Sequence, residues 1–263
     1  MKAMPWWRWV AATFLIVALW IYPAAGLELL AKQAVSGAAA WQRLLRDLVT
    51  FIPFLLATPL VWRYATGLPV ARLVNTRGRI ATSRIATGFL AWLVLSALST
   101  GVDWWLEPTA YRYTFVAATF VPFAVVVVLL LPLQTSAEEL FFRGWILRWA
   151  EGLPVAARVA ISGVVFALPH AGNPEAAGRA AAALAAWFLL GAGWAYVSVR
   201  DGGIELALGA HLANNVFSLL IVGYDGAALP TSAIMTTSSL DIYATLASLV
   251  AMVPLFALVT RRR

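Results

Sequence analysis

Eight segments of the chain are about twenty mostly apolar residues long, the length that a helix needs to cross the hydrocarbon core of a bilayer. They comprise residues 9–30, 44–62, 85–106, 113–133, 155–171, 180–199, 204–222 and 242–260. Hydrophobic residues make up 62% of the 263 residues and charged residues only 12%, whereas soluble domains are roughly one quarter charged. The sequence therefore predicts an all-α, polytopic membrane helical bundle of about eight transmembrane helices, with residues 1–263 forming a single membrane-embedded domain.

The basic residues indicate the orientation of the bundle. The net charge of +7 comes from 17 Arg and 2 Lys in short segments between the apolar runs, a pattern that suits anionic lipid headgroups and not nucleic acid. Residues 63–84 carry five arginines and no acid, so the positive-inside rule places them in the cytoplasm and Asp103 and Glu107 outside. The arginines at 261–263 also favour the cytoplasm, and eight spans that begin inside satisfy both signals. The Ala-, Gly- and Arg-rich composition favours a bacterial source, and hence the inner membrane.

Two segments admit more than one interpretation. Residues 138–149 are helical in pattern but too short and too charged for an independent span, so we expect a separate helix that dips into the protein without crossing. A ninth crossing there would place the two ends of the chain on opposite sides of the membrane, so one of the two arginine signals would have to be wrong. Residues 1–26 have some features of a signal peptide, but the apolar run continues to Leu30, which favours an uncleaved first span.

Polar residues at membrane depth are the candidates for function. A charge at the bilayer centre costs at least about 2.5–3.5 kcal/mol, so such residues are rarely incidental. The chain contains no cysteine, which excludes a thiolate nucleophile and a cysteine-ligated metal. The candidates that remain are Glu138, Glu139, Arg143, His170, His211, Asn214 and Asn215.

Helical spacing gives the two adjacent glutamates different environments. Glu139 and Arg143 are four residues apart on one face, with the acid on the N-terminal side as an ion pair prefers. Glu138 points about 100° away and is expected to be free, and a desolvated carboxylate of this kind can act as a general base. The structural alternative is a capping box at the start of a helix, because Thr135 and Ser136 each lie three residues before one of the glutamates. Capping does not explain Arg143.

The two histidines lie on two further predicted helices. His170 follows Pro169 at the end of its segment, where an isolated histidine is often only interfacial. His211 and Asn215 share one helical face, which by itself is also consistent with interhelical hydrogen bonding. If residues 151–154 form the turn of a hairpin, Glu138 and His170 each lie about fifteen positions from it and meet at one depth.

These motifs, taken in order, resemble one known family. Glu-Glu-x-x-x-Arg at 138–143, Phe-x-x-x-His at 166–170 and His-x-x-x-Asn at 211–215 are similar to the motifs of the CPBP family. This family includes CAAX prenyl endopeptidases of the Rce1 type and bacterial bacteriocin-processing or immunity proteins, also called Abi proteins. The resemblance covers residues 136–218, the expected catalytic core, and implies an intramembrane endopeptidase whose helices surround a polar cavity.

By motif position the resemblance implies a role for each residue. Glu138 and His170 activate water, His211 and Asn215 stabilise the tetrahedral oxyanion, and Glu139 and Arg143 are supporting residues. The substrate is then a peptide bond of a membrane-associated protein or peptide, and a bacterial host does not ordinarily supply prenylated proteins. Members of the family have been described both as glutamate proteases and as metalloproteases. We expect no cofactor, because the chain lacks a His-Glu-x-x-His pair, although Glu138, His170 and His211 could hold zinc.

Two other classes of function stay open at this point. A non-catalytic scaffold or bacteriocin-immunity protein could keep the same fold and bind a peptide or membrane partner without cleaving it. A proton-coupled transporter would also place acids, histidines and amides inside a bundle, but two related halves with interrupted helices are expected in that case and are not visible in the sequence.

Overall fold

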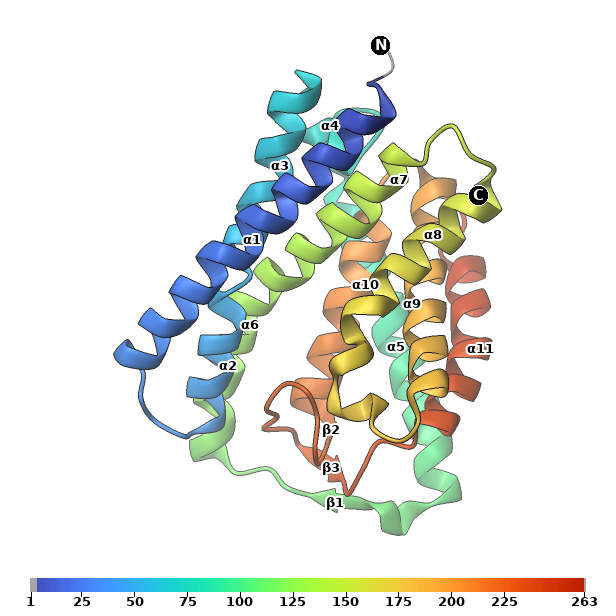
Figure 1. Cartoon of the computed structure of the whole chain (residues 1–263). Coiled ribbons are helices and arrows are strands. Elements are labelled where there is room, and N and C mark those ends of the chain that lie inside the picture. The colour runs from blue at the N-terminus through green and yellow to red at the C-terminus, as the bar shows by residue number, and fades with distance from the viewer. Residues whose placement is uncertain (1–3, 263) are drawn as a thin grey trace.

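The computed structural model describes residues 4–262 and consists almost entirely of helices that run between two ends of one bundle (Figure 1). Seven helical segments are long and apolar enough to cross a membrane. They are Trp6–Ala34, Ala40–Thr66, Thr82–Leu106, Ala117–Trp149, Val155–Gly172, Ala180–Asp201 and Ile242–Val259. The prediction of a polytopic all-α membrane protein is therefore confirmed.

Several of these segments combine more than one element. The elements are α1 (Trp6–Ala34), α2 (Ala40–Val49), α3 (Ile52–Thr66), the short α4 (Ala71–Val74), α5 (Thr82–Leu106), α6 (Ala117–Glu139), a π-helical segment (Leu140–Trp145), α7 (Ile146–Trp149), α8 (Val155–Ala167), α9 (Ala180–Asp201), α10 (Glu205–Val216) and α11 (Ile242–Val259). A 3₁₀ turn, Leu168–Gly172, continues α8, and a second π-helical segment, Phe217–Ile221, continues α10.

The predicted span 204–222 is shorter than the other seven and is packed closely against a neighbour. Residues Glu205–Ile221 form an apolar helix below span length. A Cβ atom added at Gly209 would overlap the backbone oxygen of Ile85 on α5, and one added at Gly88 on α5 would overlap that of Leu206. Small residues at a helix crossing allow backbones to approach this closely inside membranes. Two glycines therefore set the position of the helix that carries His211.

The expected separate helix at 138–149 is wrong. Residues Ala117–Trp149 form one helical segment of 33 residues, in which the π-helical segment joins α6 to α7. The polar residues that interrupted the apolar run in the sequence, Gln134 and Thr135, are buried within the bundle and do not form a loop. Because α7 and α8 then form a hairpin through residues 150–154 (Figure 1), this region adds no ninth crossing.

A small sheet, which the sequence did not predict, lies at one end of the bundle (Figure 1). Its strands are β1 (Tyr111–Tyr113), β2 (Val222–Tyr224) and β3 (Met235–Thr237), in the order β1-β3-β2. β3 pairs antiparallel with β1 and parallel with β2. Strands of three residues leave no periodic pattern in a sequence, and β1 includes the start of what was predicted as the span 113–133.

The two ends of the bundle differ in their balance of basic and acidic residues. At the end opposite the sheet, Arg84 donates to Asp201 at 2.8 Å and to the backbone oxygen of Thr260 at 2.8 Å, which joins the ends of α5, α9 and α11. We call this the arginine-rich end. At the sheet end, Asp103 accepts from Tyr111 at 2.5 Å and Asp225 pairs with Arg112 at 2.6 Å.

The charge difference predicts the orientation in the membrane. Single cysteines in this cysteine-free chain, introduced as Arg79→Cys at the arginine-rich end and Thr109→Cys at the sheet end, should be labelled from opposite sides. A membrane-impermeant maleimide added to intact cells should label Thr109→Cys at once and Arg79→Cys only after lysis, because the positive-inside rule places the arginines in the cytoplasm. The reverse order of labelling would contradict the orientation.

Candidate active site

The predicted site residues from three parts of the chain line one cavity. It has a volume of about 480 Å³ and its lining includes Glu138, His170, His211 and Asn215. These side chains come from α6, the 3₁₀ turn after α8, and α10. The cavity extends to Tyr224 on β2 and to residues 227–231 after it, so it lies towards the sheet end.

The predicted ion pair of Glu139 and Arg143 forms at the base of the site. Arg143 Nη1 donates to Glu139 Oε1 at 2.7 Å, and both side chains are completely buried. The guanidinium carbon of Arg143 lies 4.2 Å from the ring centroid of Phe166 and 5.3 Å from that of Trp194. Aromatic faces therefore surround the buried cation where the carboxylate does not reach it.

Glu139 also holds His211, which the sequence did not predict. His211 Nδ1 lies 2.8 Å from the same Oε1 atom that accepts from Arg143. An ionised carboxylate only accepts hydrogen bonds, so Nδ1 carries the proton and, in the neutral ring, Nε2 carries the lone pair. Trp194 stacks on the imidazole with the ring centroids 4.9 Å apart. Glu139 thus determines both the orientation and the tautomer of His211.

The free nitrogen of His211 faces the second glutamate. Nε2 lies 3.6 Å from Glu138 Oε2, which is longer than a hydrogen bond. Glu138 Oε2 has no hydrogen-bond donor among residues 4–262. Two acceptors at this separation can both be satisfied by one water molecule beside them, which donates one hydrogen to each.

Glu138 is not free, contrary to the prediction, because a line of amides holds its other oxygen. Gln134 Nε2 donates to Glu138 Oε1 at 2.6 Å, and Asn215 Nδ2 donates to Gln134 Oε1 at 3.3 Å. Asn214 in turn donates to Asn215 Oδ1 at 3.1 Å and accepts from Trp92 Nε1 at 3.2 Å. Every donor in this line points towards Glu138, so Oε1 is fixed and Oε2 is left for the cavity.

Both glutamates therefore lie inside a continuous helix, and the capping-box alternative is wrong. Thr135 Oγ1 donates to the backbone oxygen of Leu131, four residues earlier, as a threonine in the middle of a helix does. Sequence reasoning missed Gln134 and Trp92. Gln134 lies four residues before Glu138 in an apolar run, a spacing that could have identified it, whereas no local pattern connects Trp92 on α5 to this site.

His170 reaches the cavity from the 3₁₀ turn Leu168–Gly172. Its Nδ1 lies 2.8 Å from the backbone oxygen of Phe166, so Nδ1 is the protonated nitrogen and Nε2 is again available. Its ring packs against Trp187 with the centroids 5.2 Å apart. Within the described residues no hydrogen bond joins His170 to Glu138, although both line the same cavity.

A third acid, Glu175, lies at the sheet end of the cavity and was not predicted. Its Oε1 accepts from the Tyr224 hydroxyl at 2.7 Å and from the backbone N–H of Ala228 at 2.9 Å. Burial, and then the charge of Glu175, raise the pKa of Tyr224 above its ordinary value, so the phenol stays protonated and donates. These bonds attach the loop after β2 to the wall of the cavity.

The geometry does not form a three-ligand metal site. Across residues 4–262, no three His, Asp or Glu side chains are grouped so that they could hold one ion. Glu138 and His211 approach each other, but His170, the third residue considered for zinc, does not join them. Structural and catalytic zinc sites in proteins ordinarily need three protein ligands or more.

Comparison with known proteins shows which family this region is similar to. The family model described as type II CAAX prenyl endopeptidase Rce1-like matches residues 117–217, which contain every predicted site residue. Residues 117–217 are therefore similar to the Rce1-like family, as the three motifs predicted. The chain is also 32% identical over 181 residues to the uncharacterized protein YyaK of Bacillus subtilis (strain 168), a match that covers 66% of this chain and 60% of that relative.

The shared carboxylate gives a test of stability. Glu139→Gln removes the charge that both Arg143 and His211 use, and breaking a buried pair by removing one partner costs about 3–5 kcal/mol. We expect a clearly lower unfolding temperature in detergent and a lower yield of folded protein. Glu138→Gln is the matched control, because an amide can still accept from Gln134, and it should unfold within a few degrees of the wild type. Equal unfolding temperatures for the two variants would contradict the assigned roles.

Proposed function

We propose that the protein is an intramembrane endopeptidase that hydrolyses a peptide bond of a membrane-associated protein or peptide with water activated by Glu138. The observation that supports this most strongly is the pair formed by Glu138 Oε2 and His211 Nε2, 3.6 Å apart in the cavity. Both atoms are acceptors, and among residues 4–262 neither has another partner on the cavity side. Both belong to residues of the motifs that resemble the Rce1-like family.

In the proposed reaction, the water oxygen attacks the carbonyl carbon and Glu138 takes the water proton. Collapse of the tetrahedral intermediate breaks the C–N bond, and the same proton passes to the leaving amine. His170 assists from the other side of the cavity through its unprotonated Nε2. Gln134 acts as a positioning residue, because it fixes Oε1 of Glu138 and leaves Oε2 for the water.

His211 and Asn215 are assigned the role of stabilising the oxyanion of the tetrahedral intermediate. Asn215 Nδ2 uses one hydrogen on Gln134 and has a second hydrogen for the oxyanion. His211 can donate from Nε2 only after the second hydrogen of the attacking water passes to this nitrogen, and the Glu139 carboxylate at Nδ1 stabilises the resulting imidazolium as the aspartate of a catalytic triad does. This second proton also leaves with the amine when the intermediate collapses. Donors of this kind commonly contribute about 2.7–4 kcal/mol each to the barrier.

We further propose that the reaction needs no bound metal and that substrate enters from the sheet end. The first point is supported by the absence of a grouped ligand set within residues 4–262. The second is supported by the extent of the cavity, which runs from Glu138 to the loop after β2, away from the arginine-rich end. Combined with the orientation predicted above, the site of a bacterial inner-membrane protein then opens to the outside.

Substitutions at the site test the proposal. In proteoliposomes with a fluorogenic peptide library and a strong chelator present, Glu138→Gln should lower cleavage by about 10²–10⁴-fold while the protein stays folded. His170→Ala should have a similar effect, and Asn215→Ala a smaller one, because one oxyanion donor of two remains. Thr109→Cys, which lies outside the cavity, is the control and should cleave at the wild-type rate.

Two outcomes would contradict different parts of the proposal. Loss of wild-type cleavage in chelator, with recovery on adding zinc, would overturn the metal-free mechanism but not the peptidase activity. If Glu138→Gln, His170→Ala and His211→Ala all keep the full biological effect in cells, the protein acts as a non-catalytic scaffold or immunity protein, and the peptidase proposal fails.

A further inference from the structure

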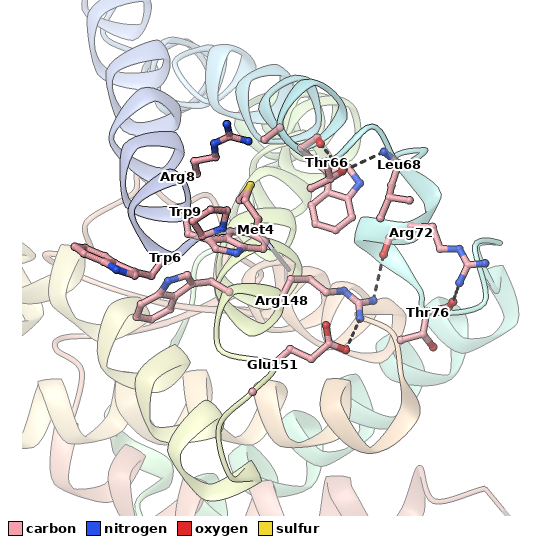
Figure 2. Close-up of a pocket in the computed structure, with 15 residues that line it drawn as sticks. Met4, Trp6, Arg8, Trp9, Thr66, Leu68, Arg72, Thr76, Arg148 and Glu151 are labelled. Atoms are coloured by element: carbon pink, nitrogen blue, oxygen red, sulfur yellow. Dashed lines mark hydrogen bonds and ion pairs between the residues drawn. The ribbon is translucent and has the colours of Figure 1, made fainter. Parts of the chain in front are cut away.

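A second and larger cavity lies at the arginine-rich end of the bundle (Figure 2). Its volume is about 1050 Å³, and it is bounded by the start of α1, the end of α3, α4 and the turn after α7. Ligand pockets usually measure about 300–1,000 Å³, so the space is large enough for a ligand. It shares no lining residue with the active-site cavity.

One wall of this cavity is a rigid aromatic surface. Trp9 and Trp62 both pack on the buried Trp145, with ring centroids 4.6 Å and 6.4 Å apart. Trp62 Nε1 also donates to the backbone oxygen of Pro69 at 3.2 Å. Trp6 and Trp149 complete the aromatic lining, and Trp6 is 75% exposed. Tryptophans with one polar and one apolar side favour the headgroup zone of a bilayer.

Three arginines from different elements line the same space. Arg8 lies on α1, Arg72 on α4 and Arg148 on α7, and Figure 2 shows all three around the cavity. Arg148 donates to the backbone oxygen of Arg72 at 3.1 Å and lies 3.7 Å from Glu151, the acid in the lining. The lining thus contains three cations and one carboxylate.

Arg8 and Arg72 differ from the arginines that hold the bundle together. Arg84 and Arg262 at the same end pair with Asp201 at 2.8 Å and 3.2 Å. Within residues 4–262, neither Arg8 nor Arg72 forms a salt bridge, and Arg72 donates only to the backbone oxygen of Thr76. Their charge is therefore available to an anionic ligand.

We propose that this cavity binds the headgroup of an anionic glycerophospholipid, with the phosphate in the space that Arg8 and Arg72 line and the glycerol against the tryptophan wall. The planar guanidinium group matches the oxygens of a phosphate. The adjoining parts of α1 and α3 expose Phe14 and Leu60, an apolar surface suited to acyl chains. The positive-inside rule assigns this end to the cytoplasmic leaflet. The proposal does not depend on the peptidase activity.

Native mass spectrometry of the delipidated full chain, titrated with phosphatidylglycerol or phosphatidylcholine, tests this site. The wild type should retain phosphatidylglycerol in preference to phosphatidylcholine. The double variant Arg8→Gln/Arg72→Gln should bind phosphatidylglycerol roughly 10- to 30-fold more weakly, as expected for two basic residues near an anionic headgroup. The matched control is Arg79→Gln, which removes an exposed arginine at the same end but outside the cavity, and it should bind within about twofold of the wild type.

Three results would overturn the proposal. The first is equal retention of the two lipids by the wild type. The second is an equal loss of phosphatidylglycerol binding in the double variant and in Arg79→Gln. The third is displacement of the lipid by an equal concentration of inorganic phosphate. The last result would identify a site for a soluble anion. Because both substituted arginines are exposed, the double variant should unfold at the wild-type temperature without lipid, so weaker binding is not a consequence of misfolding.

Discussion

The buried carboxylate of Glu139 is the contact on which the rest of the site depends. One of its oxygens accepts from Arg143 at 2.7 Å and from His211 at 2.8 Å, so a single charge compensates a cation and fixes an imidazole. A charged group at this depth is unfavourable unless it is paired. The pair therefore serves more than stability, since it determines which nitrogen of His211 faces Glu138.

The surrounding helices supply what this arrangement needs. Gly88 and Gly209 allow α5 and α10 to touch through their backbones, which places His211 opposite α6. Trp194 then packs on both His211 and the Arg143 guanidinium. Because protein interiors are packed as densely as crystals of small molecules, small shifts of α10 would separate the groups that share Glu139. The geometry of the candidate site and the packing of the bundle thus depend on the same set of contacts.

Sequence patterns predicted the parts of this structure that depend on local spacing or hydropathy. The Glu139–Arg143 pair follows from an i, i+4 spacing, and seven of the eight predicted spans appear as helices of sufficient length. The second role of Glu139 and the line of amides from Trp92 depend on contacts between α5, α6 and α10, which no local pattern records. The error at residues 138–149 has a similar cause, because burial allows polar side chains to continue a helix where hydropathy predicts its end.

The tautomer of His211 tests the central claim most directly. The chain has only two histidines, so a ¹⁵N-histidine-labelled sample gives two imidazole spin systems, and His170→Ala assigns them. In mildly alkaline buffer, the wild type should show His211 protonated at Nδ1, where Glu139 accepts, and not at Nε2, and Glu139→Gln should change this pattern of protonation. A wild-type His211 protonated at Nε2 with an unprotonated Nδ1 would contradict this claim, because Glu139 would then accept no hydrogen from the ring and Nε2 could not accept one from a water molecule beside Glu138.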